Sequence, residues 1–264
     1  MTTWSTSLLQ PPFPFRLINT GFHDGFYNMG LDEALLEGVS QGRSLPVLRL
    51  YSWKPPAVSV GYFQGLTEEV DVESCTRHGV DVVRRISGGG AVFHHEELTY
   101  SIIMPLGHPL AGETIQDSYQ RICPGIIQGL ACLGVSSRFA GINDILVEGR
   151  KISGNAQTRR MGCVLQHGTL LLASDVDLMF ELLLVPQEKL KDKCIQDVRD
   201  RVTSLKALLS RDIAYEEVAL AVAEGFRRGL SLDFIPIPLQ EEEEARAREL
   251  ATGKFAAPQW LYSR

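Results

Sequence analysis

The chain has 264 residues, and its 26 Lys and Arg against 32 Asp and Glu give a formal net charge of −6. This acidic balance argues against a general nucleic-acid binder, because such proteins hold their ligand by neutralising phosphates with Lys and Arg. No apolar run approaches the roughly 20 residues that a membrane-spanning helix needs, so we expect neither a nucleic acid nor a membrane among the partners.

The N-terminal region begins with residues 1–14, which contain prolines but no basic stretch followed by an apolar core. We therefore expect an extended arm and a protein that stays in the cytoplasm. Beyond the arm, apolar periodicity predicts helices over 26–42 and 71–78. Alternating or continuous apolar runs predict strands over 15–20, 47–53, 57–62, 80–84, 91–94 and 98–104.

The second half of the chain opens with the helix expected to be the longest, which begins at Thr114 and kinks at Pro124. Strands are expected over 135–139, 142–147, 150–153 and 164–173, with a hairpin turn between the second and third of these. From about residue 175 the pattern is mostly helical, and the acidic run 241–244 is predicted as a solvated helix face. Together these patterns predict an α+β fold, with mixed β-sheets flanked by helices in a single domain over 15–264.

Five cysteines are spread along the chain without a Cys-x-x-Cys pair: Cys75, Cys123, Cys132, Cys163 and Cys194. Their odd number and irregular spacing are typical of a reducing cytoplasm and of neither a disulfide scaffold nor a zinc site. Cys163 and His167 share one face of an expected strand but stand about 13 Å apart at about 3.3 Å per residue, so no nucleophile–base pair is expected. His167 is either a ligand contact or a hydrogen-bonded core histidine.

The segment from Arg84 to His94 is the least ordinary in the chain, because two arginines precede three adjacent glycines at the end of an expected strand. Adjacent glycines permit positive φ and let a ligand approach bare backbone N–H groups. An anion or an acyl chain is the expected ligand. The candidate binding residues are Arg84, Arg85, Ser87, Gly88, Gly89, Gly90, Ala91, Val92, Phe93 and His94. The loop matches neither the P-loop nor the Rossmann fingerprint, and ordinary core positions are the alternative for Phe93 and His94.

A second cluster lies at Asn143 and Asp144, with Lys151 following across the expected hairpin. Side chains alternate faces along a strand, so Lys151 and Ser153 are expected on one side, facing the 143–144 pair. Lysine is a compact cation suited to a phosphate or a developing oxyanion, and Asp144 could order that lysine or hold a magnesium ion. A surface hairpin with a solvated lysine is the alternative.

Both clusters belong to a set of segments by which the sequence resembles the lipoate-protein ligase A family, within the superfamily of biotin protein ligases and octanoyltransferases. The matching segments cover 28–34, 61–64, 84–94, 98–101, 141–144 and 150–154. The resemblance implies mixed sheets that enclose a U-shaped lipoyl-adenylate, in a biotin/lipoate-ligase catalytic-domain architecture. It implies that the glycine loop and Arg85 hold this ligand, that Lys151 lies at the carboxyl-phosphate junction, and that Asn143 and Asp144 border the nucleotide and its magnesium. Gly154 and His167 are expected in the same site.

The resemblance further implies an ATP-dependent lipoate-protein ligase. Lipoate or octanoate would be activated with ATP and magnesium to an acyl-adenylate, and a specific lysine of a lipoyl carrier domain would then take the acyl group. The expected carriers are of the 2-oxoacid dehydrogenase E2 or glycine-cleavage H protein type. Lys151 and the loop amides would stabilise the charged oxygens of both steps. Long-form ligases carry a further C-terminal domain that has no counterpart in this chain, so a small accessory ligase subunit is also expected.

Two alternatives stay open beside the ligase. The residues around 153–157 and 165–168 are close to octanoyltransferases, which move octanoate from acyl carrier protein through a cysteine thioester without ATP. Those enzymes place their cysteine in a loop ahead of the lysine hairpin, whereas residues 136–144 contain no cysteine. Neither Cys132 nor Cys163 replaces it well, so the ligase is the favoured hypothesis. The second alternative is a non-catalytic module that binds lipoate or a carrier. The roles of these two cysteines and of His95, which stands where many members carry Asp, are left open.

Overall fold

The computed structural model describes residues 10–173, 175–184 and 199–264. The strands are β1 (Phe13–His23), β2 (Val47–Trp53), β3 (Ala57–Val60), β4 (Asp81–Arg84), β5 (Val92–His94), β6 (Glu97–Pro105), β7 (Arg138–Ala140), β8 (Asp144–Val147), β9 (Arg150–Arg160), β10 (Cys163–Leu171) and β11 (Leu232–Ile235). The helices are α1 (Gly25–Ser40), α2 (Leu66–Glu69), α3 (Val72–Arg77), α4 (Ile115–Ile122), α5 (Pro124–Cys132), α6 (Val176–Leu182), α8 (Leu205–Leu209), α9 (Tyr215–Gly229), α10 (Glu241–Leu250) and α11 (Pro258–Leu261).

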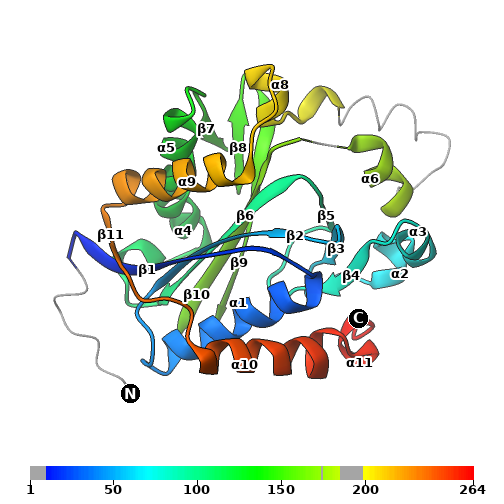
Figure 1. Cartoon of the computed structure of the whole chain (residues 1–264), viewed down its shortest axis with the longest axis horizontal. Helices are drawn as coiled ribbons and strands as arrows, with labels where there is room; N and C mark the ends of the chain where they lie inside the picture. The colour runs from blue at the N-terminus through cyan, green and yellow to red at the C-terminus, as the bar shows by residue number, and fades with distance from the viewer. Residues whose placement is uncertain (1–9, 174, 185–198) are drawn as a thin grey trace.

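These strands form two sheets. The larger has eight strands in the order β11-β1-β2-β6-β10-β9-β8-β7, and the smaller has three in the order β4-β3-β5 (Figure 1). β1 is parallel to both β2 and β11, and β3 is parallel to β4, whereas the other neighbouring pairs are antiparallel. The mixed sheets of the predicted α+β fold are therefore confirmed.

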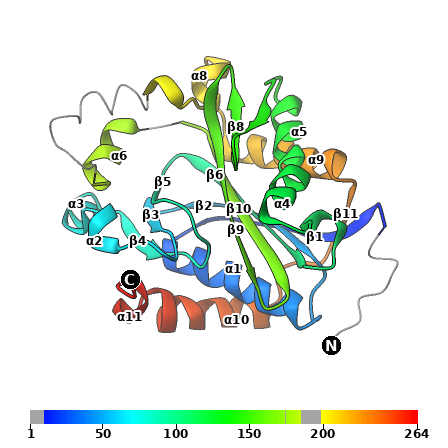
Figure 2. The same cartoon turned by 180° about the vertical axis from the view of Figure 1, so that it is seen from behind.

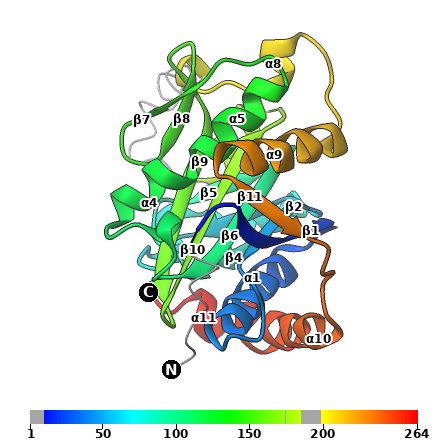
Figure 3. The same cartoon turned by 90° about the vertical axis from the view of Figure 1, so that its left-hand side faces the viewer.

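Helices cover both faces of the eight-stranded sheet. α1 packs with α10 on one face, and α4, α5 and α9 cover the other (Figures 1 and 3). Alternate residues of β2 point to opposite faces of the sheet and belong to the two apolar layers there, as the two-residue period of a strand requires. Leu48 and Leu50 belong to the cluster beneath α5 and α9, while Val47 and Tyr51 belong to the cluster that faces α1. None of the described helices combines the length and the apolar character needed to cross a bilayer.

The three-stranded sheet lies at one side of the molecule, next to α2, α3 and α6 (Figure 2). A separate apolar cluster joins these elements and includes Val58, Cys75 and Leu182. β4 ends at Arg84 and β5 begins at Val92, so the glycine-rich segment is the loop that joins the two edge strands of this sheet. The loop therefore starts and ends on a packed scaffold, which fixes the positions of its two ends.

The structure differs from the sequence prediction at several elements. The chain breaks into two helices at Pro124, where a single kinked helix was expected, and α1 is longer than either piece. β9 continues to Arg160, seven residues beyond its predicted end, because its polar residues find partners inside the sheet. Asn155 accepts a hydrogen bond from the Tyr100 hydroxyl, and Gln157 donates one to Gln166. In the predicted N-terminal arm, residues 1–9 lie outside the described residues, and β1 begins earlier than predicted, at Phe13.

The acidic run at the start of α10 is only partly the solvated face that was predicted. Glu243 forms an ion pair of 2.6 Å with Arg16, which is 2% exposed. Glu244 instead pairs with Arg248 on the outer surface of the same helix. One carboxylate of the run therefore compensates a buried charge, which the local sequence pattern did not reveal.

His108 gives a testable pH dependence of folding stability. Its ring is buried between Phe13 and Phe15, and burial lowers its pKa to about 4. In the unfolded chain its pKa is about 6.5. Because the folded chain binds the proton less well, the stability contributed by neutral His108 is fully present above about pH 6.5 and is lost as the pH falls towards 4.

We expect this loss to reach about 3 kcal/mol at low pH, from the size of the shift at about 1.4 kcal/mol per unit. Urea titrations of the wild type and of His108→Phe between pH 7 and 4 measure it. The difference in free energy of unfolding between the two proteins should change across this window. A difference that stays constant with pH would contradict the assignment.

Candidate functional site

A cavity of about 350 Å³ takes its wall from both sheets and from the glycine loop. Its apolar wall includes Met29 of α1, Trp53 of β2, Phe93 of β5 and Ile152 of β9. Most of the residues predicted for the site also line it. These are Arg85, Gly89, Gly90, Ala91, Val92, Phe93, His94, Asn143, Lys151, Gly154 and His167. Two clusters that are separate in the sequence therefore meet around one cavity.

The glycine loop is held from inside by Arg85. Its guanidinium donates hydrogen bonds to the carbonyl oxygens of Ser59, Gly88 and Gly90, at 2.7–2.9 Å, and to the Ser59 hydroxyl at 3.1 Å. Burial lowers the pKa of Arg85 to about 10, so the group stays charged near neutral pH. The hydrogen bonds of Arg85 therefore shape the loop. Arg85 also lines the cavity, so it would lie next to a ligand bound there.

The loop also depends on a close approach of two backbones. A Cβ atom added to Gly61 would lie 2.0 Å from the carbonyl oxygen of Gly89, and Gly89 itself has φ of +99°. Among the described residues, the backbone amides of 88–91 donate no hydrogen bond. They are therefore available to an anionic or polarised oxygen, as the sequence predicted for this loop.

The close approach predicts a difference between two glycine substitutions. Gly61→Ala should destabilise the fold by about 1–3 kcal/mol or more, because the Gly89 carbonyl would have to move. Gly90→Ala is the matched control, since an added Cβ there meets no atom within 4 Å. Denaturant titration of the two variants measures the difference. Equal free energies of unfolding would contradict the steric account.

Three of the predicted loop residues lie outside the lining of the cavity. Arg84 donates to the carbonyl oxygens of Gly61, Gln64 and Leu261, and the Trp260 indole donates back to the Arg84 carbonyl. Arg84 therefore joins the strand end to α11 and does not line the cavity. Ser87 is fully buried behind the wall, and Gly88 presents its carbonyl to Arg85.

Lys151 lies at the partly exposed edge of the cavity, with 42% of its side chain exposed. Its Nζ is 2.7 Å from Oδ1 of Asp144, so the two residues face each other across the β8–β9 hairpin as predicted. A Cβ atom on Gly154 would lie 2.8 Å from this Nζ, so a larger residue there would make the end of the lysine side chain move. Asn143 and Asn155 exchange hydrogen bonds beside the pair and brace the hairpin.

The described residues around Asp144 do not form a metal site made of protein ligands alone. The Asp144 carboxylate is paired with Lys151, and no group of three or more His, Cys, Asp or Glu side chains able to hold a metal occurs within the described residues. Magnesium in proteins is usually bound through one or two carboxylates together with waters and substrate phosphates. In the structure Asp144 pairs with Lys151, which is the other of its two predicted roles.

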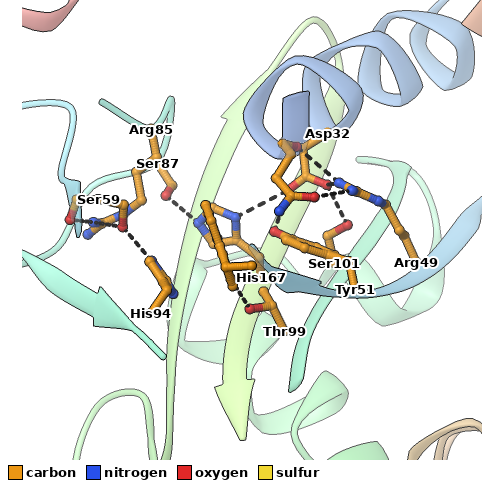
Figure 4. A network of polar contacts seen from close by, with 12 residues as sticks. Asp32, Arg49, Tyr51, Ser59, Arg85, Ser87, His94, Thr99, Ser101 and His167 are labelled. Atoms are coloured by element: carbon orange, nitrogen blue, oxygen red, sulfur yellow. Dashed lines mark hydrogen bonds and ion pairs between the residues drawn. The ribbon is translucent and has the colours of Figure 1, made fainter. Parts of the chain in front are cut away.

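His167 joins a buried network that the sequence did not predict (Figure 4). Its Nε2 is 2.6 Å from the Ser87 hydroxyl, and its Nδ1 is 3.4 Å from Asp32. Asp32 also forms a 2.8 Å ion pair with Arg49. Burial lowers the pKa of His167, although Asp32 opposes that shift. Burial would raise the pKa of Asp32, but His167 and Arg49 hold it below its usual value.

A second buried chain of hydrogen bonds runs through His94. Its Nε2 is 2.7 Å from the Ser59 hydroxyl, and its Nδ1 is 2.8 Å from Glu97. The indole of Trp53 stacks on the imidazole with ring centroids 4.0 Å apart. Ser59, His94 and Glu97 all line the cavity. The sequence pointed only to His94, although a lone hydroxyl in the apolar strand 57–60 was a usable signal for Ser59.

None of the described cysteines lines the cavity. Burial raises the pKa of Cys75 and Cys163 to about 11 and that of Cys123 to about 12, so these thiols stay protonated near neutral pH. Cys132 is exposed on α5. Cys194 lies outside the described residues. Cys163 and His167 lie four residues apart on β10, as expected, and the partners of His167 are Ser87 and Asp32.

Comparison with known proteins identifies the family to which a chain with this cavity belongs. The family model of the lipoyl protein ligase A/B catalytic domain matches residues 24–227. The chain belongs to this family. The octanoyltransferase LipM of Geobacillus kaustophilus is 37% identical over 95% of this chain and 98% of its own length. LipM of Bacillus subtilis is 35% identical with the same coverage of both chains.

Solved structures of family members superpose on the whole fold. The bipartite lipoate protein ligase of Thermoplasma acidophilum gives a TM-score of 0.85 at 30% identity, covering 94% of this chain and 96% of that one. A lipoate-protein ligase A bound with ATP gives 0.81 at 27% identity, covering 95% and 99%. The predicted lipoate-ligase family and its catalytic-domain architecture are therefore confirmed.

The expectation of an ATP-dependent ligase is wrong for this member of the lipoyl protein ligase A/B family. The relatives that match over nearly their full length at 35–37% identity are octanoyltransferases, a class of enzyme that uses no ATP. The motifs around the glycine loop and Lys151 identified the family correctly. They did not separate its two reactions, because both reactions need the same acyl cavity and the same stabilised oxyanion.

Proposed function

We propose that this protein is an octanoyltransferase that moves an octanoyl group from acyl carrier protein to a specific lysine of a lipoyl carrier domain. The observation that carries the proposal is the full-length similarity to octanoyltransferases. The apolar cavity next to Lys151 supports it, because the cavity offers an acyl chain an apolar wall and places a cation at its edge.

The chemistry needs a stabilised negative oxygen but no nucleotide. Attack on the thioester carbonyl of the donor turns its oxygen into an oxyanion, and fixed donors aimed at that oxygen lower the barrier. Lys151, held by Asp144, and the free amides of the glycine loop are the donors proposed for it. In the net reaction an amide bond forms to the carrier lysine, the C–S bond breaks, and the amine proton ends on the released thiol.

The proposed acceptor is a lipoyl domain of the 2-oxoacid dehydrogenase E2 or glycine-cleavage H protein type. The Thermoplasma protein has been studied together with its E2 lipoyl domain, which supports a carrier of this kind. Lipoate and octanoate carry the same acyl linkage, so the same cavity would serve either chain. An accessory subunit that assists adenylation has no step to perform in this reaction.

The test is transfer without nucleotide. The protein is incubated with octanoyl-acyl carrier protein and an unmodified lipoyl domain, and intact-mass spectrometry follows the acceptor. We expect the acceptor to gain one octanoyl group in the absence of ATP. A parallel reaction contains octanoate, ATP and magnesium but no acyl carrier protein. Product in that reaction alone would refute the proposal, and binding of the donor without turnover in either reaction would instead favour a non-catalytic module.

A further inference from the structure

The face of β9 that lines the cavity continues beyond the cavity itself. Side chains alternate along a strand, and Gly154 and Ala156 line the cavity, so Thr158 and Arg160 point to the same side of the sheet. The intervening Arg159 points to the opposite face, where it donates to backbone carbonyl oxygens just before α4. One row of side chains therefore leads from the cavity to Arg160.

At the end of this row, two arginines lie against one tyrosine ring. The guanidinium carbon of Arg160 is 4.3 Å from the centroid of the Tyr62 ring, and that of Arg264 is 5.2 Å from it. Contact with Arg160 and, second to it, with Arg264 lowers the pKa of the Tyr62 hydroxyl. Within the part of the chain that the structure describes, neither arginine forms an ion pair with a carboxylate. Guanidinium groups without a counter-ion are suited to bind a phosphate.

The same tyrosine lies next to the glycine loop. Tyr62 follows Gly61, and a Cβ atom on Gly61 would lie 2.0 Å from the Gly89 carbonyl oxygen. A Cβ atom on Gly89 would in turn lie 3.9 Å from the Cβ atom of Ala156. Phe63 is 75% exposed, and its ring lies beside the same loop. An exposed apolar ring and two guanidinium groups therefore border the loop that lines the cavity.

The dimensions of this row match those of the proposed donor. An acyl carrier protein presents its thioester on a flexible arm, which is attached through a phosphodiester and carries two methyl groups next to it. About 14 bonds join the phosphorus to the thioester carbon, or about 16 Å at three bonds per about 3.5 Å. The Cβ position of Gly154 is 2.8 Å from Nζ of Lys151, and the six-residue step from Gly154 to Arg160 spans about 20 Å at about 3.3 Å per residue. An arginine side chain can cover the difference.

We propose that Arg160 and Phe63 form a subsite for the phosphodiester arm of the acyl donor, which deepens the proposed function and rests on it. Arg160 donates hydrogen bonds to the phosphate oxygens, and Phe63 packs on the two methyl groups. The arm then follows the row of Thr158 and Ala156 into the cavity, which brings the thioester next to Lys151. Arg160 contacts the donor equally before and during the reaction, so it lowers the KM for the donor and leaves kcat unchanged.

The experiment compares two small donors that differ only in the phosphate, octanoyl-4′-phosphopantetheine and octanoyl-pantetheine. Calorimetry measures the binding of each to the full chain, and acylation of a lipoyl domain gives KM and kcat. We expect the wild type to bind the phosphorylated donor about 10-fold or more tightly than the other, with the same preference in KM. Arg160→Ala should remove most of this preference and bind octanoyl-pantetheine as the wild type does. Arg160→Lys should restore part of it, because the charge is kept.

Arg228→Ala is the matched control, because Arg228 is an exposed arginine of α9, on the opposite face of the eight-stranded sheet (Figure 3). It should keep the preference for phosphate. Equal binding of the two donors by the wild type, or a preference that survives Arg160→Ala, would overturn this inference and leave the transferase intact. The subsite would also be overturned if Arg160→Ala weakened only octanoyl-acyl carrier protein, since acidic residues of the carrier would then be the ligand. Phosphate-selective binding through Arg160 without acylation of a carrier by any donor would keep the subsite and refute the transferase.

Discussion

Replacing Lys151 by alanine is expected to lower the rate of octanoyl transfer by about 10²-fold or more, the scale for removing one oxyanion donor. Lys151 is the cation that lines the edge of the cavity next to Asp144 and the unpaired loop amides. Single-turnover assays with saturating octanoyl-acyl carrier protein would measure the change. Binding of the donor should weaken far less than the rate, because the charge on the oxygen develops only during the reaction.

Lys206→Ala is the control for this change. Lys206 also forms a 2.7 Å lysine–aspartate pair, with Asp212, but it does not line the cavity. Its loss should leave the transfer rate unchanged. A wild-type rate in the Lys151 variant would remove the proposed oxyanion donor from the mechanism.

Replacing Asp32 by alanine is expected to have the largest effect on stability, a loss of about 3–5 kcal/mol in the free energy of unfolding. Asp32 is 2% exposed and compensates Arg49, which is fully buried. Removing the carboxylate leaves the guanidinium buried without its counter-ion. Denaturant titration would measure the loss, and the same variant should free His167 from one of its two partners.

Glu224→Ala provides the comparison for Asp32. Glu224 pairs with both Arg227 and Arg228 on α9, where the two arginines are exposed and the Glu224 side chain is 30% exposed. Exposed ion pairs contribute little because water and salt screen them. We expect the stability of this variant to stay close to that of the wild type. If Asp32→Ala and Glu224→Ala lower the free energy of unfolding by the same amount, the buried Asp32–Arg49 pair does not contribute the stability expected of it.

The parts of the site that the sequence revealed are those whose residues lie close together in the chain. The glycine loop and the Lys151 hairpin each occupy about ten consecutive residues, so their composition alone indicated ligand binding. Asp32 and His167 are 135 positions apart, and Ser87 and His167 are 80 apart. Contacts at such separations exist only after the sheets have formed, so local pattern could not predict them.

The fold shows the same limit. Strands and helices with clear apolar periodicity, such as β2 and α9, appear where the sequence predicted them. β11 was missed because it is four residues long and is defined by its parallel pairing with β1. The second half of β9 was missed because the apolar pattern used to predict the strand ends at residue 153. The hydrogen-bond partners of the polar side chains in this half lie on other strands. Polar groups that are hydrogen-bonded in this way can be buried in a folded protein.

The link between Arg84 and α11 has a consequence for proteolysis and for engineered tails. Two residues of this helix exchange hydrogen bonds with the side chain and the backbone of Arg84, at the point where the glycine loop begins. Cleavage before Trp260 would remove hydrogen-bond partners of the buried Arg84 guanidinium. The start of the glycine loop would then be held less firmly. A chain shortened in this way should therefore bind and transfer the acyl group less well, although none of the removed side chains lines the cavity.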